Sequence, residues 1–415
     1  MAKKVDLPEP IIPNDSWKVV KLGQYVKILN GYPFDSSRFT NSNENTYPLI
    51  RIRDVVRGYT ETFTDEDCPD EYKIKKGEIL IGMDGDFNIS RWKSDFGLIN
   101  QRVCKISTVS KDLDEKFLFY YLPIPLKLIN DATPSVTVKH LSSTSLQELH
   151  FPLPTLAEQQ RVVNRIELKF AKMDEAKERA QNVVDGFETR KAAILHKAFT
   201  GELTAKWRKE NGVCDDSWVE KTIGECGSVY GGGTPSSSHK DYWENGNILW
   251  ITSKDMKNDI IEDSEMHVNM KGIENSSAKF IEKPALLFVM RSGILRRTFP
   301  ICMVKKEFTV NQDLKALVPY GFVLLEYLFY VCKSNEREIL NTCMKNGTTV
   351  ESINAKALFD FVIFVPTIPE QVEIVRILDI IIEKENKAKQ AAEAVLEQID
   401  LLKKSILARA FRGDL

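Results

Sequence analysis

A segment of fifty residues occurs twice in this chain, in register and without a gap. The first copy, residues 154–203, begins PTLAEQQ and ends ILHKAFTGEL. The second copy, residues 366–415, begins PTIPEQV and ends ILARAFRGDL. A gapless repeat of this length indicates a duplicated structural unit. Its offset of 212 residues places one copy at the end of each half of the chain.

Both copies carry the signals of a long capped helix. Thr155 and Thr367 each precede a glutamate by three residues, which is the spacing of a capping box. Gly201 and Gly413 follow the last apolar residues, where a left-handed cap favours glycine. Gly186 is the only glycine inside either copy and imposes a small local cost. The sequence therefore predicts two helices of about 45 residues, each roughly 65 Å long.

Apolar residues recur every three and four positions along both copies, which is the spacing of a coiled-coil seam. The seam residues of the first copy are Val163, Ile166, Phe170, Met173, Ala180, Val184, Phe187, Ile194 and Ala198. Those of the second copy are Val375, Leu378, Ile382, Ala392, Leu396, Ile399, Ile406 and Ala410, with Glu385 in place of Met173. Lys177 and Lys191 fill the two remaining steps of the first seam, and Lys389 and Lys403 fill those of the second. We expect the two helices to pack on each other, antiparallel if a pseudo-twofold axis relates the halves. A long surface helix on a globular core is the alternative.

The segments that precede the two helices repeat more loosely. Their shared markers are Ser16-Trp17 with Ser217-Trp218, Asn100-Gln101 with Asn311-Gln312, and residues 136–141 with 348–353. Apolar runs bounded by turn residues predict strands at 79–85, 101–107, 285–291 and 313–319. Amphipathic spacing predicts helices at 116–130 and 322–340. A common framework with different loops suggests two domains with related but different ligands.

The predicted fold class is α+β, with two globular domains separated by a pair of long helices that pack as an antiparallel coiled coil. An internal pseudo-twofold repeat relates the two halves. The predicted parts are an N-terminal tail at 1–15, a first domain at 16–152, a central helix at 153–205, a second domain at 217–364 and a C-terminal helix at 365–415.

Composition and motif searches limit the functions that this chain could perform. The 415 residues carry a formal net charge of −2, so any attraction to nucleic acid must come from local patches or from a partner. No apolar run reaches the ~18 residues of a membrane span, and the N-terminus lacks the apolar core of a signal peptide. Seven scattered cysteines fit a reducing cytoplasm, which is the predicted location.

Motifs of catalysis and metal binding are missing from the sequence. There is no Walker A loop, no G-x-G-x-x-G after a strand, and no Cys or His cluster with zinc spacing. Residues 69–73, PDEYK, superficially match the core of a nuclease, but the two parts of that core are adjacent here rather than separated. The five histidines show no paired carboxylate or cysteine that would indicate a catalytic or metal site, so we interpret them as satisfied surface or core residues.

The order of variable domain, long helix, variable domain and long helix resembles the specificity subunit of type I restriction-modification systems. The helix-opening motif of that family matches Pro154, Glu158 and Gln159, and again Pro366, Glu370 and Gln371. Its Gly-x-Thr-Pro-Ser loop matches residues 232–236, followed by Trp243 and Trp250. The first domain departs from that loop and has Gly31-Tyr-Pro-Phe34 instead, so residues cannot be transferred between the domains.

The resemblance implies a DNA-recognition subunit without catalysis or a cofactor of its own. Each domain would be a target-recognition domain that reads one half of a split, asymmetric double-stranded DNA site. The helices would set the distance between the half-sites and dock two methyltransferase subunits, which carry S-adenosylmethionine. Whether a restriction subunit then joins is left open.

Polar and basic loop residues are the candidates for DNA contact. Arginine can bind guanine with two hydrogen bonds, and serine or lysine can bind phosphate. The candidates in the first domain are Ser36, Arg38, Asn88, Ser90, Arg91 and Lys93. Those in the second are Thr234, Ser236, Ser237, Lys240, Arg291, Arg296 and Arg297. Solvated surface charge is the alternative for these residues, and we expect Phe34 and Trp243 to belong to the core.

Two other functions compete with DNA recognition. A protein scaffold would use the helix pair alone and would have no need for two like domains with unlike loops. A nuclease or methyltransferase would need the catalytic motifs that the sequence lacks.

Overall fold

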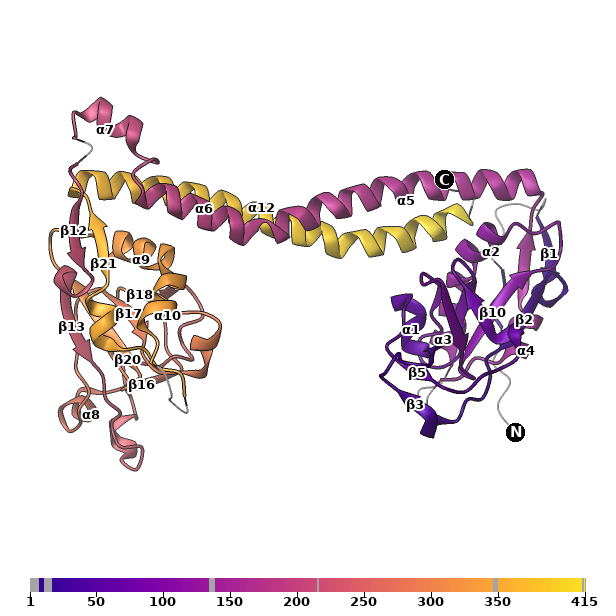
Figure 1. The fold of residues 1–415 in the computed structure, drawn as a ribbon, viewed down its shortest axis with the longest axis horizontal. Helices are drawn as coiled ribbons and strands as arrows, with labels where there is room; N and C mark the ends of the chain where they lie inside the picture. Colours follow the sequence, from indigo (N-terminus) through magenta and orange to yellow (C-terminus); the bar gives the residue numbers. More distant parts are fainter. Residues whose placement is uncertain are drawn as a thin grey trace. The chain divides into compact units, whose positions relative to one another are not determined.

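The structure, a computed structural model, describes residues 7–10, 17–133, 139–214, 216–345, 350–412 and 414. The chain divides into two compact units, Met1–Gln181 with Glu393–Leu415, and Asn182–Ala392. Each unit contains one globular α+β domain and part of both long helices (Figure 1). The predicted markers at Ser16, at 136–138 and at 348–349, and the predicted cap at Gly413, lie outside the described residues.

The first unit contains three sheets among its described residues. A two-stranded sheet pairs β1 (Lys18–Lys21) with β11 (His150–Leu153). The second sheet has the order β2 (Val26–Asn30), β10 (Val103–Thr108), β7 (Ile79–Gly82) and β8 (Ile89–Arg91). The third has the order β3 (Phe39–Thr40), β5 (Phe63–Thr64), β4 (Tyr47–Ile50), β9 (Phe96–Ile99) and β6 (Lys73–Lys75). Its helices include α1 (Ile52–Arg57), α2 (Glu115–Tyr121), α3 (Pro123–Ala132) and α4 (Ser143–Glu148).

The described part of the second unit also contains three sheets. The short sheet pairs β12 (Val219–Thr222) with β21 (Val362–Val365). The largest has the order β13 (Gly227–Gly231), β20 (Leu314–Pro319), β17 (Ala285–Val289), β18 (Ile301–Val304) and β15 (Ile260–Ile261). The third has the order β16 (Met266–Val268), β14 (Ile248–Ile251) and β19 (Phe308–Val310). Its helices include α7 (Ala205–Asn211), α8 (Met270–Glu274), α9 (Leu325–Ser334), α10 (Glu336–Cys343) and α11 (Ala355–Phe359).

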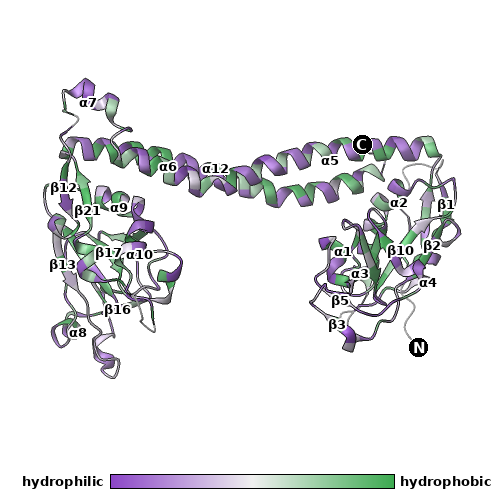
Figure 2. Cartoon of the chain, in the orientation of Figure 1, coloured by the Kyte–Doolittle hydropathy of each residue, from purple (hydrophilic) through white to green (hydrophobic). Residues whose placement is uncertain are grey.

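The two domains share one framework, as the sequence predicts. The four-strand order β2-β10-β7-β8 recurs as β13-β20-β17-β18. The parallel pair of β4 and β9 recurs as β14 and β19, with Leu49 opposite Leu98 and Leu249 opposite Phe308. The strands predicted at 79–85, 101–107, 285–291 and 313–319 are β7, β10, β17 and β20. Apolar colour concentrates on these central strands and polar colour on the outer loops (Figure 2).

The predicted helices form, but three of them are interrupted. The central copy consists of α5 (Leu156–Asp185) and α6 (Phe187–Phe199), separated by Gly186. Main-chain hydrogen bonds from Gly186 to Asn182 and from Arg190 to Gly186 carry the helix across this residue. The C-terminal copy is one helix, α12 (Ile368–Ala410). The helices predicted at 116–130 and 322–340 divide at Leu122 and Asn335, the first because Pro123 has no N–H to donate.

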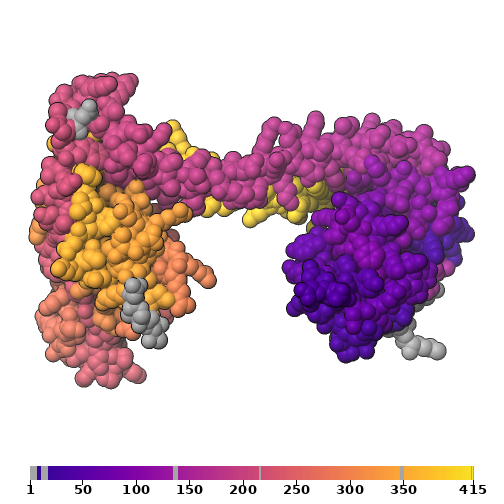
Figure 3. All heavy atoms as spheres, in the orientation of Figure 1, coloured from indigo at the N-terminus to yellow at the C-terminus, as the bar shows by residue number. Residues whose placement is uncertain are grey.

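The long helices are antiparallel within each unit. In the first unit the start of α5, at Val162 and Ile166, shares a core with Ala410 at the end of α12 and with Phe411 directly after it. In the second unit the start of α12, at Ile374, Leu378 and Ile382, shares a core with the end of α6 at Leu195 and Ala198. Each core also includes sheet residues of the domain in the same unit. In Figure 3, α6 and the second domain form one continuous surface. The helices are therefore packed both on each other and on their domains.

Polar side chains fix how the helices pair. In the first unit Lys403 donates to Asp174 and lies 5.1 Å from the Phe170 ring centre. In the second unit Lys389 lies 4.7 Å from the Phe187 ring centre, and Arg190 pairs with Glu385 at 2.8 Å. The lysines of the second seam thus keep their charge over aromatic faces of the first copy. None of the helices in the described ranges combines the length and apolar content needed to cross a bilayer.

Candidate nucleic-acid interface

A buried glutamine fastens each long helix to its own domain. The Oε1 atom of Gln159 accepts from the Asp114 N–H at 2.7 Å, and its Nε2 donates to the carbonyls of Asp112 and Pro154, both at 2.8 Å. Gln371 repeats this arrangement, accepting from the Leu324 N–H at 2.8 Å and donating to the carbonyls of Phe322 and Pro366. Both glutamines are 0% exposed. The repeated Pro and Gln of the helix-opening motif are therefore the two ends of one hydrogen-bonded clasp.

The glutamates before these glutamines do not complete the predicted capping boxes. Thr155 accepts from the Glu158 N–H at 3.4 Å, but the Glu158 carboxylate binds Arg161 instead of the Thr155 N–H. This hydrogen bonding holds the pKa of Glu158 below its usual value. The prediction was wrong because in each copy an arginine supplies a stronger, charged donor than the main chain.

The second glutamate is instead part of a buried cluster. Glu370 is 0% exposed and accepts from the Thr204 hydroxyl at 2.7 Å and from the Arg208 guanidinium at 2.8 Å. Arg208 belongs to α7 and lies over Gly201, which has the left-handed φ of +79° expected of a closing glycine. The segment between α6 and the second domain is thereby anchored to the start of α12.

Glycines allow each recognition loop to pass close to a strand end. A Cβ atom at Gly31 would lie 2.1 Å from the Asn100 carbonyl oxygen, and one at Gly232 would lie 1.9 Å from that of Val310. Both positions are therefore closed to any other residue unless the main chain moves. The Asn-Gln markers of the sequence lie at these crossings. In the second domain the Thr234 hydroxyl donates to Gln312 at 2.5 Å.

Two tryptophans hold the Gly-x-Thr-Pro-Ser loop of the second domain. The indole N–H of Trp250 donates to the Gly233 carbonyl at 3.1 Å, and that of Trp243 donates to the Ser236 carbonyl at 3.3 Å. The two rings meet edge to face, with 5.2 Å between centres. The structure thus places Trp243 in the support of the loop, while the side chains of Thr234, Ser236, Ser237 and Lys240 are exposed.

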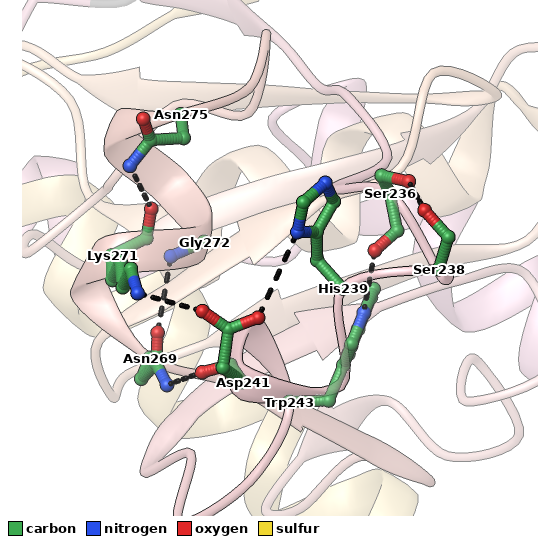
Figure 4. Close-up of polar contacts among 9 residues, drawn as sticks. All are labelled: Ser236, Ser238, His239, Asp241, Trp243, Asn269, Lys271, Gly272 and Asn275. Atoms are coloured by element: carbon green, nitrogen blue, oxygen red, sulfur yellow. Dashed lines mark hydrogen bonds and ion pairs between the residues drawn. The ribbon is translucent and has the colours of Figure 1, made fainter.

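A charged network anchors the far side of this loop (Figure 4). Lys271 on α8 donates to the Asp241 carboxylate at 2.7 Å, and Asn269 donates to the Asp241 carbonyl at 2.6 Å. His239 lies 3.8 Å from the same carboxylate. The hydrogen bond from Lys271 holds the pKa of Asp241 below its usual value. Because its base is fixed, the loop can present its hydroxyl groups in a defined geometry.

The three arginine candidates of the second domain differ in their surroundings. Arg296 pairs with Glu351 on a neighbouring segment, which lowers the pKa of Glu351. Arg291 is exposed and forms a main-chain bridge with Ser352. Arg297 is exposed and its side chain makes no ion pair or hydrogen bond to the described residues. Arg297 and Arg291 therefore have free donors, whereas those of Arg296 are partly used.

In the first domain the candidates occupy two segments. Ser36 and Arg38 lie on a 3-10 helix, η2 (Ser36–Arg38), where Arg38 pairs with Asp65 at 2.8 Å. That hydrogen bond lowers the pKa of Asp65. Phe34 is 4% exposed and belongs to a small core with Leu49 and Leu98, as expected.

The second group of first-domain candidates lies on and around β8. Asn88 and Lys93 are exposed and Ser90 is half-buried. Arg91 donates to the Gly77 carbonyl and to Glu115, both at 2.8 Å, and so ties β8 to α2. Phe87 has a positive φ of 52° with a buried side chain, a rare conformation for a bulky residue, and it precedes the exposed Asn88.

The candidates of each unit occupy two groups, residues 36–38 and 88–93 in the first unit and residues 234–240 and 291–297 in the second. Among the described residues no hydrogen bond or ion pair joins the two groups of a unit. The sequence analysis named Gln159 and Gln371 as motif residues and Gln312 as a shared marker but predicted none of their contacts, and it missed Arg208.

Sites for other chemistry are not evident in the described ranges. No three His, Cys, Asp or Glu side chains converge there as metal ligands. The nuclease-like segment forms a 3-10 helix, η3 (Asp70–Tyr72), in which Asp70 is bound by Lys73 at 2.7 Å.

A duplicated α+β domain on antiparallel helix arms, with a glutamine clasp in both copies and a different polar loop in each domain, defines a protein with two related recognition modules. The family model described as type I restriction modification DNA specificity domain matches residues 14–183 and 215–398. The chain belongs to this family and is a type I restriction-modification specificity subunit.

Individual relatives agree with this assignment. The chain is 29% identical over 421 residues to the type I restriction enzyme EcoBI specificity subunit of Escherichia coli, covering 97% of this chain and 87% of that protein. It is similar in fold to the HsdS subunit of Thermoanaerobacter tengcongensis, with a TM-score of 0.62, 20% identity and 97% and 98% coverage. A chain from a structural study of complex assembly and conformational transition in a type I system matches with a TM-score of 0.67 and 19% identity, over 99% of this chain and all of that one.

Proposed function

We propose that the chain reads a bipartite, asymmetric DNA site, one half with each domain. The observation that carries the proposal is the combination of an identical support and different loops. Both domains have the same strand order and the same glutamine clasp. One holds Gly232–Ser236 on two tryptophans, whereas the equivalent Gly31–Phe34 of the other contributes Phe34 and Tyr32 to a small core. Two unlike loops would read two unlike half-sites, so the complete site would not be a palindrome.

The paired helices would serve as the spacer and as the docking surface for two methyltransferase subunits. Apolar side chains on the outer faces of the long helices support docking, because Leu168 is 67% exposed and Leu401 is 66% exposed. Large apolar residues without cover favour a protein partner. The partner would supply S-adenosylmethionine and the methyl-transfer chemistry, and a restriction subunit would join that core. This chain would recognise DNA in the cytoplasm without catalysing a reaction.

Methylation by the reconstituted complex tests this function. The chain is co-expressed with the methyltransferase subunit of its own system, and methylated adenines are mapped on a DNA library by sequencing. We expect two short specified sequences separated by a fixed unspecified gap, and no methylation by either subunit alone. A continuous or palindromic motif would contradict two-domain reading. Stable assembly without any DNA binding would favour the scaffold alternative.

A further inference from the structure

The second unit has a basic surface in which only Arg297 is among the predicted DNA-contact residues. Two hollows of roughly 630 and 550 Å³ adjoin each other and share Thr298 and Lys333 in their walls. The larger hollow lies between α6 and the helices α9 and α10, and the smaller lies beside the loop before β15. We call the two together the basic track. Its cations are Lys191, Lys254, Lys257, Arg297, Lys333 and Arg337.

Five of these cations, all except Lys333, have no side-chain partner among the described residues, and three of the five line the larger hollow. The side chains of Lys191, Arg297 and Arg337 make no ion pair and no hydrogen bond to the described residues. The first is on α6, the second follows η6 (Gly293–Arg296) and the third is on α10. Segments that are separate in the sequence thus turn unpaired positive charge toward one hollow. Because no carboxylate of the described residues pairs with these three side chains, their positive charge is available to attract an external anion.

The track has fewer acidic than basic side chains, and one of its carboxylates is already hydrogen-bonded within the protein. Its walls contain six cations and the carboxylates of Glu188, Glu336 and Asp259. Glu336 accepts hydrogen bonds from the Thr298 hydroxyl at 2.5 Å and the Phe299 N–H at 2.8 Å, so its carboxylate is bound to the loop. The next hollow along the domain is lined by Asp255, Glu265 and Asp313, so the basic track ends at Lys254.

The first unit does not repeat this feature at the position equivalent to Lys191. Lys403 occupies that position in the second copy and is bound by Asp174. The residue 212 positions after Asp174 is Asn386, which has no charge to offer Lys191. The loss of this one carboxylate leaves Lys191 free, so the charge of the track is not a by-product of the repeat.

We propose that the basic track binds the sugar-phosphate backbone of duplex DNA beside the half-site read by the second domain. This inference rests on the proposed function. Arginine and lysine side chains on separate segments suit phosphates, which recur along a duplex, and such contacts fix the register of a protein on DNA without reading bases. Arg297 is the last residue of the predicted DNA-contact segment 291–297, so a DNA backbone held in the track would continue along that segment.

Salt dependence of DNA binding tests the track. A triple variant, Lys257→Gln with Arg337→Gln and Lys191→Gln, is assembled with the methyltransferase subunit and compared with the wild-type complex. Each lost phosphate contact lowers the slope of log affinity against log salt by about 0.9, so we expect a slope smaller by about 3. Affinity should fall equally for the cognate duplex and for a random duplex, and the methylated sequence should not change.

A control variant removes the same charge elsewhere on this unit. Lys209, Lys356 and Lys384 are exposed, have no ion pair among the described residues and lie outside the track. Their glutamine variants should leave the slope unchanged. A wild-type slope in the track variant would overturn the proposal, and so would a defect in assembly, which would mean that an acidic protein surface occupies the track. If the wild-type complex reads no bipartite site, the proposed function fails, but the slope on random duplex still tests the track.

Discussion

At the scale of single residues, the buried amide of the helix-opening motif has the most defined role. Gln159 and Gln371 satisfy main-chain groups at the start of the long helix and at the preceding domain helix, in the same way in both copies. Glu158 and Glu370 occupy equivalent positions in the sequence but differ in burial and in partner. Equivalent glutamates of the repeat therefore have different roles, because the partner of Glu370 is Arg208, which lies outside the repeated segment.

The clasp can be tested with two neighbouring glutamines. Gln159→Ala removes the acceptor of the Asp114 N–H and the donor to two carbonyls, so the chain should lose about 2–4 kcal/mol of stability. Gln160→Ala changes an exposed side chain and should alter stability by less than about 0.5 kcal/mol. Urea unfolding followed by circular dichroism measures both. Equal midpoints for the two variants would show that the clasp does not stabilise the domain.

The two glutamates also provide a matched pair. Arg208→Met would leave the carboxylate of Glu370 buried without its cation and should cost about 3–5 kcal/mol. Arg161→Met breaks the exposed pair with Glu158 and should cost no more than about 1 kcal/mol. Thermal unfolding of the full chain compares the variants. Similar shifts in the two melting temperatures would refute the assigned difference in burial.

At the scale of elements, the loops are set by close packing against strand ends. Gly232 lies where β13 leads into the recognition loop, and a side chain there would collide with the carbonyl of Val310 on β19. Trp243 and Trp250 then fix the direction of the loop. A recognition loop of this kind is a local extension of the sheet, so its sequence can vary only between its fixed points.

Replacing Gly232 by alanine should therefore damage recognition by the second domain alone. The new Cβ would lie 1.9 Å from the Val310 oxygen, and the loop must move to relieve the contact. We expect methylation to lose its dependence on one half-site, or to fall at least tenfold, while the first half-site remains specified. Gly321→Ala is the control, because a Cβ there meets nothing within 4 Å and Gly321 lies outside the candidate DNA-contact segments. Wild-type methylation by the Gly232 variant would contradict the placement of the loop.

At the scale of the whole molecule, the duplication gives two domains and two long helices, and each compact unit is built from one domain and parts of both helices. Each unit takes the start of one long helix and the end of the other, so neither half of the sequence forms a unit by itself. The seam residues are buried or half-buried along both helices. Changing the length of one helix alone would therefore shift the seam against its partner.

Lengthening both helices should change the gap in the DNA site. Seven residues inserted near Gln181 and near Ala392 preserve the heptad and add about 10 Å of helix, which corresponds to about three base pairs. We expect the unspecified gap to grow by that amount and both half-sites to stay the same, as read by methylation sequencing. The same insertion in α12 alone should lower stability. An insertion at residues 200–205 would not test the gap, because it would disrupt the hydrogen bonds that Thr204 and Arg208 donate to Glu370.

The repeat, the helices, the seam and the central strands could be predicted because they depend on local periodicity and on capping residues. The closing glycine at Gly201 and the strand at 285–289 are examples. Helix divisions at Leu122 and Asn335 were missed, the first because apolar spacing outweighed the signal of Pro123. For the candidate site, the sequence pattern could identify polar loops, but it could not show which of their side chains form ion pairs or hydrogen bonds within the protein.

The sequence by itself determined the duplicated architecture and the family, because both reside in residue spacing along the chain. Only the tertiary structure decided that Gln159 binds a segment 45 residues upstream, that Arg208 reaches Glu370 across 162 residues, and that Arg297 is free while Arg296 is paired. These roles depend on which distant segments meet in space. The spacing of residues within one segment does not show which distant segment will pack against it, and that packing decides the burial and the partner of each side chain.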